Sequence, residues 1–290
     1  MHTLIQKLVS QGPVLTDGAW GTQLQARGLE AGECPDHWNL THADRVEEVA
    51  RAYVEAGSWV ILTNTFRANR LALAGHGLAP QVREINLRGA EISRRAAGSK
   101  ARVFASLGPS GKLLMTGEVC EDELLAAFTE QAKSLAEAGA DALIFETMSD
   151  LAEARVGVQA ARSTGLPVIV SVAFDSGKNL DRTMMGATPE MAAAELTAAG
   201  ADVIGANCGQ GIETYPAICQ RLHDATTLPI WIKPNAGMPE LVDGRTVYKT
   251  RPQQFAQHAP ELIAAGAVFL GGCCGTNPLF IRALREVGMY

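Results

Sequence analysis

The sequence predicts an α/β fold in which a closed (β/α)8 barrel of parallel strands is wrapped by helices. Two observations predict it: apolar runs alternate with helical segments along the whole chain, and there are eight such units. The length of 290 residues suits this fold, because a barrel of this type takes about 250 residues as one domain. No change in composition, flexible linker or low-complexity tract divides the chain, so we expect a single domain over residues 1–290.

The elements follow a regular order after a short amphipathic helix within residues 1–11. The expected strands occupy residues 13–17, 59–63, 102–106, 142–145, 167–173, 202–206, 229–233 and 265–270. The expected helices that follow them occupy residues 46–56, 82–96, 121–137, 151–162, 189–199, 215–225, 252–264 and 278–287. Several helices begin with a capping side chain followed by a proline, as at Thr188-Pro189 and Asn277-Pro278. Eight units favour a closed barrel over an open doubly wound sheet.

The composition excludes several classes of partner. Hydrophobic residues make up 47% of the chain and charged residues 19%, as in soluble globular proteins. The formal charge of -6 argues against general affinity for nucleic acid or anionic membranes. No window approaches the roughly 20 apolar residues that cross a bilayer, and residues 1–11 lack the apolar centre of a signal peptide. We therefore expect no nucleic-acid partner, no membrane partner and a cytoplasmic location.

Polar and chemically capable residues follow nearly every expected strand. In a barrel of this type the active site lies at the carboxyl ends of the strands, so residues far apart in sequence meet at one rim. The residues expected at this rim are Asp17, Thr63, Asn64, Thr65, Gly108, Pro109, Glu146, Thr147, Asp175, Asn207, Cys208, Asn235, Cys273 and Cys274.

Three of these rim residues are cysteines. Cys273 and Cys274 stand between glycines after the last strand, and Cys208 ends an earlier apolar run and is also followed by glycine. Thiolates are soft ligands that suit zinc, and the flanking glycines allow sharp turns that point neighbouring side chains at one ion. Three protein ligands leave one tetrahedral position open, which is typical of a catalytic zinc site.

Other interpretations of the cysteines stay open on spacing alone. Free cysteines are often buried as small hydrophobic residues, and an adjacent pair could be redox-active. The common zinc signature, with two residues between paired cysteines, is absent. Six cysteines without a regular framework fit a reducing compartment, and we interpret Cys34, Cys120 and Cys219 as structural.

The chemistry of such a zinc site points to a thiol substrate. Zinc held by three thiolates carries net negative charge and is a poor Lewis acid, whereas it can bind a fourth thiol and present it as a thiolate nucleophile. Asp17 and Glu146 are candidates to hold an ammonium group, and backbone amides between Gly18 and Gly21 could receive a carboxylate. Together these features describe an amino acid that bears a thiol.

Each polar candidate also has a structural interpretation. Asp17 could shape an Asp-Gly turn, and Glu146 could cap the next helix or pair with Arg155. Asn207 and Asn235 could be turn residues rather than ligands. None of the six histidines stands at a strand end with a carboxylate partner, so we do not expect a histidine-based mechanism.

Six motifs in order resemble those of the homocysteine S-methyltransferase family. The resemblance is strongest to the homocysteine-binding domain of cobalamin-dependent methionine synthase, and it extends from about residue 17 to residue 278. The motifs occupy residues 17–22, 63–66, 145–147, 206–208, 234–237 and 271–276.

The resemblance implies a zinc-dependent enzyme that transfers a methyl group to the thiol of homocysteine and gives methionine. It implies that Cys208, Cys273 and Cys274 bind Zn²⁺ and that the sulfur of homocysteine takes the open position. The implied substrate contacts are Asp17, Gly18, Thr65, Glu146 and Asn235, the last of which also lies near the zinc and ligates it when substrate is absent.

Two classes of methyl donor are compatible with these motifs. One is a methylated corrinoid on a separate protein, which we favour, and the other is a small sulfonium such as S-methylmethionine or S-adenosylmethionine. Arg67 stands where betaine-using relatives are expected to carry an aromatic residue, and it suits a quaternary ammonium poorly. A rival of another class is a zinc- or thiol-binding module that holds homocysteine without turnover and needs no room for a donor.

Overall fold

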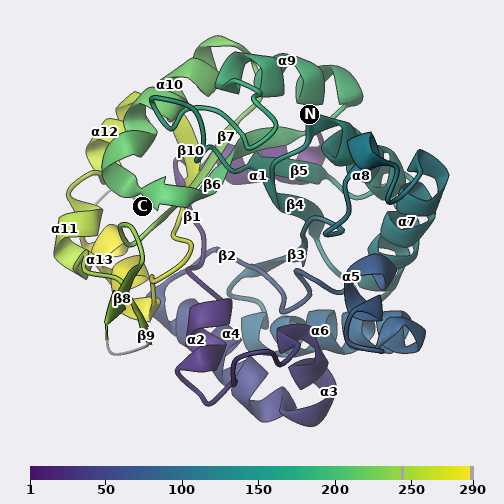
Figure 1. Ribbon diagram of the computed structural model, residues 1–290. Coiled ribbons are helices and arrows are strands. Elements are labelled where there is room, and N and C mark those ends of the chain that lie inside the picture. The colour runs from purple at the N-terminus through teal and green to yellow at the C-terminus, as the bar shows by residue number, and fades with distance from the viewer. Residues whose placement is uncertain (243–244, 288–290) are drawn as a thin grey trace.

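The computed structural model describes residues 1–242 and 245–287, and eight parallel strands form its main sheet (Figure 1). The spatial order is β1-β10-β7-β6-β5-β4-β3-β2, as expected for a barrel in which neighbours in sequence are neighbours in space. The eight predicted strands are therefore confirmed. Their bounds are β1 Val14–Leu15, β2 Val60–Ile61, β3 Arg102–Leu107, β4 Ala142–Met148, β5 Val168–Val172, β6 Val203–Gly211, β7 Ile230–Asn235 and β10 Ala267–Leu270.

The sheet is brought to near closure where its two short edge strands, β1 and β2, meet. The backbone N–H of Trp59 donates to the carbonyl of Leu15 at 2.8 Å, beside the start of β2. Nearer the carboxyl ends of these strands, a side chain takes the place of a backbone carbonyl as acceptor. Asp17 Oδ2 accepts from the backbone N–H of Leu62 at 2.7 Å. The seam is thus joined by this backbone bond, by the carboxylate of Asp17 and by the hydroxyl of Ser58, which donates to the carbonyl of Thr16 at 3.2 Å.

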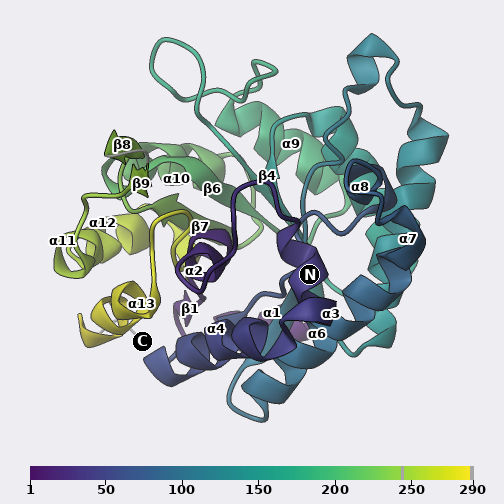
Figure 2. The ribbon, with the colours of Figure 1, turned by 60° about the horizontal axis from the view of Figure 1, so that its bottom comes forward.

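The main helices surround the strands as a ring (Figures 1 and 2). Their bounds are α4 Ala43–Ala56, α6 Val82–Ala97, α7 Glu121–Glu137, α8 Leu151–Arg162, α9 Pro189–Ala199, α10 Tyr215–Asp224, α11 Pro252–Ala256, α12 Ala259–Ala264 and α13 Pro278–Glu286. The predicted single helix over residues 252–264 is wrong, because α11 and α12 are separate. Pro260 has no N–H to donate to an earlier carbonyl, so it stands in the first turn of a new helix rather than continuing the old one. None of the helices in the described ranges is long and apolar enough to cross a membrane.

Several short elements in the loops were not predicted from the sequence. The helices are α2 Gly21–Gln25, α3 Trp38–Thr41 and α5 Arg70–Ala74, and the 3-10 turns are Pro35–His37, Ala79–Gln81, Leu114–Thr116 and Ile212–Thr214. An antiparallel hairpin, β8 Glu240–Val242 with β9 Arg245–Val247, follows β7. These segments are too short to show a hydrophobic period, and most follow the carboxyl ends of strands, where they frame the rim.

The amino end of the barrel is filled by aromatic side chains. Phe104, Trp231 and Phe269 are fully buried, and their ring centroids lie 5.4 to 6.4 Å apart. Ile5 and Leu8 of the N-terminal helix α1 (Thr3–Val9) belong to the same cluster and cover this end. The barrel interior is therefore packed below, and space for a ligand is left at the carboxyl ends of the strands.

Candidate metal and substrate site

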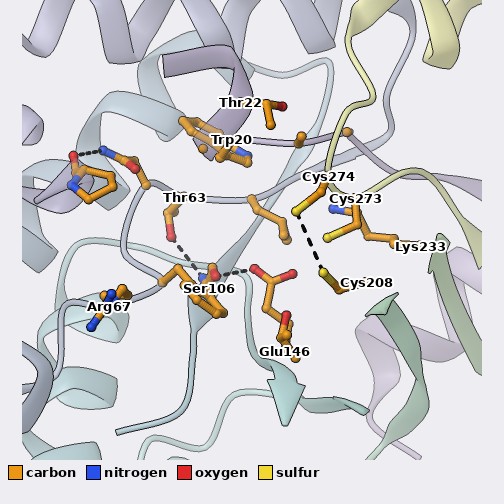
Figure 3. Close-up of a pocket in the computed structure, with 18 of the residues that line it drawn as sticks. Trp20, Thr22, Thr63, Arg67, Ser106, Glu146, Cys208, Lys233, Cys273 and Cys274 are labelled. Carbon is orange, nitrogen blue, oxygen red and sulfur yellow. Dashed lines mark hydrogen bonds between the residues drawn. The ribbon is translucent and has the colours of Figure 1, made fainter. Parts of the chain in front are cut away.

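A cavity of about 280 Å³ opens at the carboxyl ends of the strands (Figure 3). The parallel register brings the strand ends to one level, as where Asn207 of β6 lies opposite Lys233 of β7. The cavity is lined by residues from the ends of six strands and by the loop that contains α2. The lining residues that matter for its chemistry are Gly18, Trp20, Asp36, Thr63, Arg67, Ser106, Glu146, Lys233, Cys208, Cys273 and Cys274.

The three predicted cysteines meet at one side of the cavity. The sulfur atoms of Cys208, Cys273 and Cys274 all lie within 4.8 Å of one another, with Cys208 and Cys274 at 3.8 Å (Figure 3). Backbone bonds to β7 fix the pair, because Cys273 N–H donates to Pro234 and Cys274 C=O accepts from Ala236 at 2.7 and 2.9 Å. The prediction that cysteines from two strand ends converge is confirmed.

The donor set fits a soft divalent cation. A hydrogen bond with Cys273 lowers the pKa of Cys208, but the bond with Cys274, burial and the charge of Cys274 together raise that pKa to about 12. Ionisation of three thiols in one partly buried site needs a compensating cation, and a zinc ion held by Cys208, Cys273 and Cys274 would supply it. The buried Oδ1 of Asn235 has no hydrogen-bond partner in the described part of the chain, but Asn235 is not among the residues that line the cavity.

Asn207 of β6 connects this cluster to β5 and β4, the next two strands of the sheet. Its side chain is fully buried, and its Oδ1 accepts from the N–H of Thr147 at 2.8 Å and from the hydroxyl of Ser171 at 2.7 Å. Its Nδ2 donates to Thr147 Oγ1 at 2.8 Å and points to the sulfur of Cys273 at 3.8 Å. The partners of this side chain lie 36 to 66 positions away in the sequence, whereas a turn residue bonds to the backbone beside it.

Asp17 lies beneath the cavity rather than on its wall. Its carboxylate is fully buried, with Oδ1 accepting from Lys233 Nζ at 2.5 Å and Oδ2 accepting from Trp20 Nε1 at 2.8 Å as well as from Leu62. Burial lowers the pKa of Lys233, but the charges of Asp17 and Glu146 outweigh burial and raise it, so the lysine stays cationic. Sequence reasoning missed Lys233, although a lysine that ends the apolar run Ile230–Ile232 was a signal.

Glu146 lines the cavity and is available to a ligand. Its only partner among residues 1–242 and 245–287 is the hydroxyl of Ser106, which donates to Oε1. Burial raises the pKa of Glu146, and the charge of Lys233 and the bond from Ser106 oppose that rise. The two structural interpretations of this carboxylate are excluded. Asp150 caps the next helix, and Arg155 pairs with Glu195 at 3.0 Å.

Thr65 is placed behind the cavity wall. It is fully buried, and its hydroxyl donates to the carbonyl of Ser106 at 2.7 Å and lies 2.5 Å from that of Thr63. Thr63, rather than Thr65, is among the residues that line the cavity. The structure thus brings Thr65 near the site without exposing its hydroxyl to a ligand.

Gly18 does line the cavity, and the structure explains the need for glycine there. A Cβ at this position would lie 2.7 Å from the hydroxyl of Tyr53 and 2.8 Å from Thr276 Oγ1. Any larger residue would displace one of these buried side chains. The close approach keeps the Asp17-Gly18 segment tight against the loop that carries Cys273 and Cys274.

The mouth of the cavity carries one exposed cation. Arg67 is exposed and lies across the cavity from the cysteines (Figure 3). The neighbouring Asp36 is 2% exposed, and its Oδ1 accepts from the backbone N–H of Arg67 at 3.0 Å. Burial raises the pKa of Asp36 to about 6. The thiol of Cys34 donates to the other oxygen of Asp36, which fits the structural interpretation of that cysteine.

Comparison with known proteins agrees with this geometry. The family model described as homocysteine S-methyltransferase matches residues 14–287. The methionine synthases of Mycobacterium leprae (strain TN) and Mycobacterium tuberculosis (strain ATCC 25618 / H37Rv) are 32% and 33% identical to this chain over 97% and 95% of its length. The chain spans 24% of the length of each. The metallated form of the homocysteine methyltransferase MmuM from Escherichia coli superposes with a TM-score of 0.83 at 25% identity, covering 99% of this chain and 100% of that one. This chain therefore belongs to the homocysteine S-methyltransferase family.

Proposed function

We propose that this chain transfers a methyl group to the thiol of homocysteine and produces methionine, with zinc bound by Cys208, Cys273 and Cys274. The observation that carries the proposal is the convergence of three sulfur atoms within 4.8 Å at the edge of a ligand-sized cavity. Zinc bound by three thiolates supplies an open position that lowers the pKa of a substrate thiol. The remaining wall of the cavity orients the substrate and the donor.

We propose that Glu146 accepts hydrogen bonds from the ammonium group of homocysteine. Its carboxylate faces the cavity, and its Oε2 has no partner in the part of the chain that the structure describes. A charge-assisted bond of this kind is stronger than a neutral one, so it would fix the amino acid end while the sulfur is held at the cysteines. Gly18 lines the same cavity, and we propose that the substrate carboxylate is received by the backbone amides of Trp20 and Gly21, because the N–H of Ala19 already donates to Thr276 Oγ1.

The proposed contacts of Asp17, Thr65 and Asn235 with substrate or metal differ in how many existing hydrogen bonds must break to allow them. Asp17 and Thr65 are engaged with Lys233 and Ser106, so direct contact needs these hydrogen bonds to open. Asn235 has an unused, buried Oδ1 next to the backbone that pairs with Cys273 and Cys274. Asn235 therefore needs the least rearrangement to act as a ligand when substrate is absent.

For the donor, we propose a methylated corrinoid carried by a separate protein. The likeness to methionine synthases supports this, and so does Arg67, because an exposed guanidinium at the mouth disfavours a free cationic sulfonium. The alternatives are S-methylmethionine and S-adenosylmethionine. The cavity reaches from the cysteines to Arg67, which leaves room for a second reactant and speaks against a thiol-binding module without turnover (Figure 3).

The test compares initial rates of methionine formation with methylcobalamin, S-methylmethionine and S-adenosylmethionine at equal concentration on zinc-loaded protein. A rate at least tenfold higher with methylcobalamin is expected. A preference for either sulfonium would overturn the donor proposal and leave the transferase proposal intact. Tight homocysteine binding without methionine from any of the three donors would favour the binding module.

A further inference from the structure

We propose that Asn207 is a positioning residue that donates a hydrogen bond to the thiolate of Cys273 and holds the strand end that carries Glu146 at a fixed distance from the three cysteines. The proposal rests on the proposed zinc site, and it concerns how that site is tuned rather than whether it exists.

The orientation of the Asn207 amide is fixed by its partners. The backbone N–H of Thr147 can only donate, so the atom that it contacts at 2.8 Å must be the amide oxygen. The hydroxyl of Ser171 contacts the same oxygen at 2.7 Å. The amide nitrogen is therefore the atom that faces Cys273 Sγ, because a flipped amide would set its NH2 group against the N–H of Thr147.

The donor side of this contact is shielded from solvent, whereas the sulfur of Cys273 is partly exposed in the cavity. Asn207 is fully buried, so water does not compete for its amide hydrogens. A hydrogen bond to an ionised acceptor is stronger than a neutral one, and low local dielectric strengthens it further. The Nδ2 to Sγ distance of 3.8 Å is long, as is usual for sulfur acceptors, and a thiolate bound to a metal would carry the charge that this donor complements.

The same side chain also stabilises the backbone next to two residues that have left-handed backbone conformations. Thr147 has a φ of 60° and Cys208 a φ of 62°, which residues with a Cβ seldom adopt. Asn207 precedes Cys208 directly, and it holds Thr147 through both the backbone N–H and the hydroxyl. One side chain thus couples Glu146, which precedes Thr147, to Cys208 and Cys273.

The decisive variant is Asn207→Asp. It keeps the shape and the oxygen that accepts from Thr147 and Ser171, but it replaces the donor facing Cys273 with an oxygen. We expect zinc affinity, measured by competition with a chromophoric chelator, to fall about 10- to 100-fold, as is typical when an outer-shell partner of a metal ligand is changed. In cobalt-substituted protein, the sulfur-to-cobalt charge-transfer band should shift relative to wild type.

Ser171→Ala is the matched control. It removes one hydrogen bond to the same amide without touching the sulfur, so zinc affinity and the charge-transfer band should stay at wild-type values while thermal stability falls slightly. If Asn207→Asp does not fold, Asn207→Ser, which is too short to reach the sulfur, carries the same expectation.

Two results would overturn the proposal. One is a folded Asn207 variant with wild-type zinc affinity and an unshifted band, and the other is an equal change in Ser171→Ala. Failure of the underlying zinc site is distinguishable, because wild-type protein would then bind neither zinc nor cobalt at the cysteines.

Discussion

Lys233 Nζ lies 2.5 Å from Asp17 Oδ1, and neither side chain is more than 2% exposed. The pair joins β7 to the segment after β1, and the second oxygen of Asp17 joins that segment to Leu62, just beyond β2. It therefore reinforces the seam at which the barrel closes, directly beneath the cavity. A buried pair of this kind matters most when one partner is removed, because the other is left as an uncompensated charge.

Replacing Lys233 with methionine should lower the free energy of unfolding by about 3–5 kcal/mol, because Asp17 would remain buried without its cation. Denaturant unfolding followed by circular dichroism measures this. Lys249→Met is the control, since its ion pair with Glu240 is largely exposed and such pairs contribute about 0–1 kcal/mol. Similar losses of unfolding free energy in the two variants would show that the buried ion pair stabilises the fold no more than the exposed one.

Cys273→Ala should abolish zinc binding and homocysteine binding together. The two thiolates that remain would bind zinc much more weakly than the three-sulfur site does. Metal analysis and titration calorimetry on the same preparations test this. Cys120→Ala, at an exposed cysteine outside the cluster, should retain one zinc per chain. Homocysteine binding that persists in zinc-free protein would refute the assigned role of the sulfur cluster.

Glu146→Gln should raise KM for homocysteine about 10- to 100-fold, since a hydrogen bond to a charged group contributes about 1.5–3 kcal/mol. The variant should keep its zinc, because Glu146 is not one of the clustered ligands. A substrate analogue without the ammonium group, 4-mercaptobutanoate, provides the comparison. If the substitution weakens the binding of this analogue as much as that of homocysteine, Glu146 does not bind the ammonium.

Asp36 should make stability depend on pH. Burial raises its pKa from 3.8 to about 6 in the folded protein, so the folded state holds this proton at pH values where the unfolded chain releases it. The contribution is fully present below about pH 4 and is lost as pH rises through about 6, by about 3 kcal/mol. Unfolding of wild type and Asp36→Asn between pH 4 and 7 isolates this component, and parallel stability curves for the two proteins would contradict it.

The parts of the fold that the sequence predicted well are those with a strong local period. Uninterrupted apolar runs marked all eight strands, and helices 121–137, 151–162 and 189–199 were predicted with the bounds that the structure has. The sulfur cluster was predictable because Cys208 and the later pair each follow such a run. Fold topology then brought them together, although 64 residues separate Cys208 from Cys273.

The parts that escaped prediction depend on contacts between strands. Lys233 and Asp17 stand 216 positions apart, and no local pattern shows that their side chains meet inside the barrel. Asn207 could be placed at the rim but not oriented, because its partners lie on two other strands and on the loop of Cys273. Thr65 illustrates the reverse case, since its motif pointed to the rim while packing turned its hydroxyl toward the backbone of Ser106.

The aromatic cluster of Phe104, Trp231 and Phe269 fills the amino end of the barrel, so the cavity opens toward the carboxyl ends of the strands. A molecule that binds beside Arg67 would lie between solvent and the cysteines on the far side of the cavity. We expect homocysteine to enter first and the methyl donor second, with methionine leaving only after the spent donor has withdrawn. A donor that binds first would obstruct the path of homocysteine, so we expect ordered binding of the two substrates.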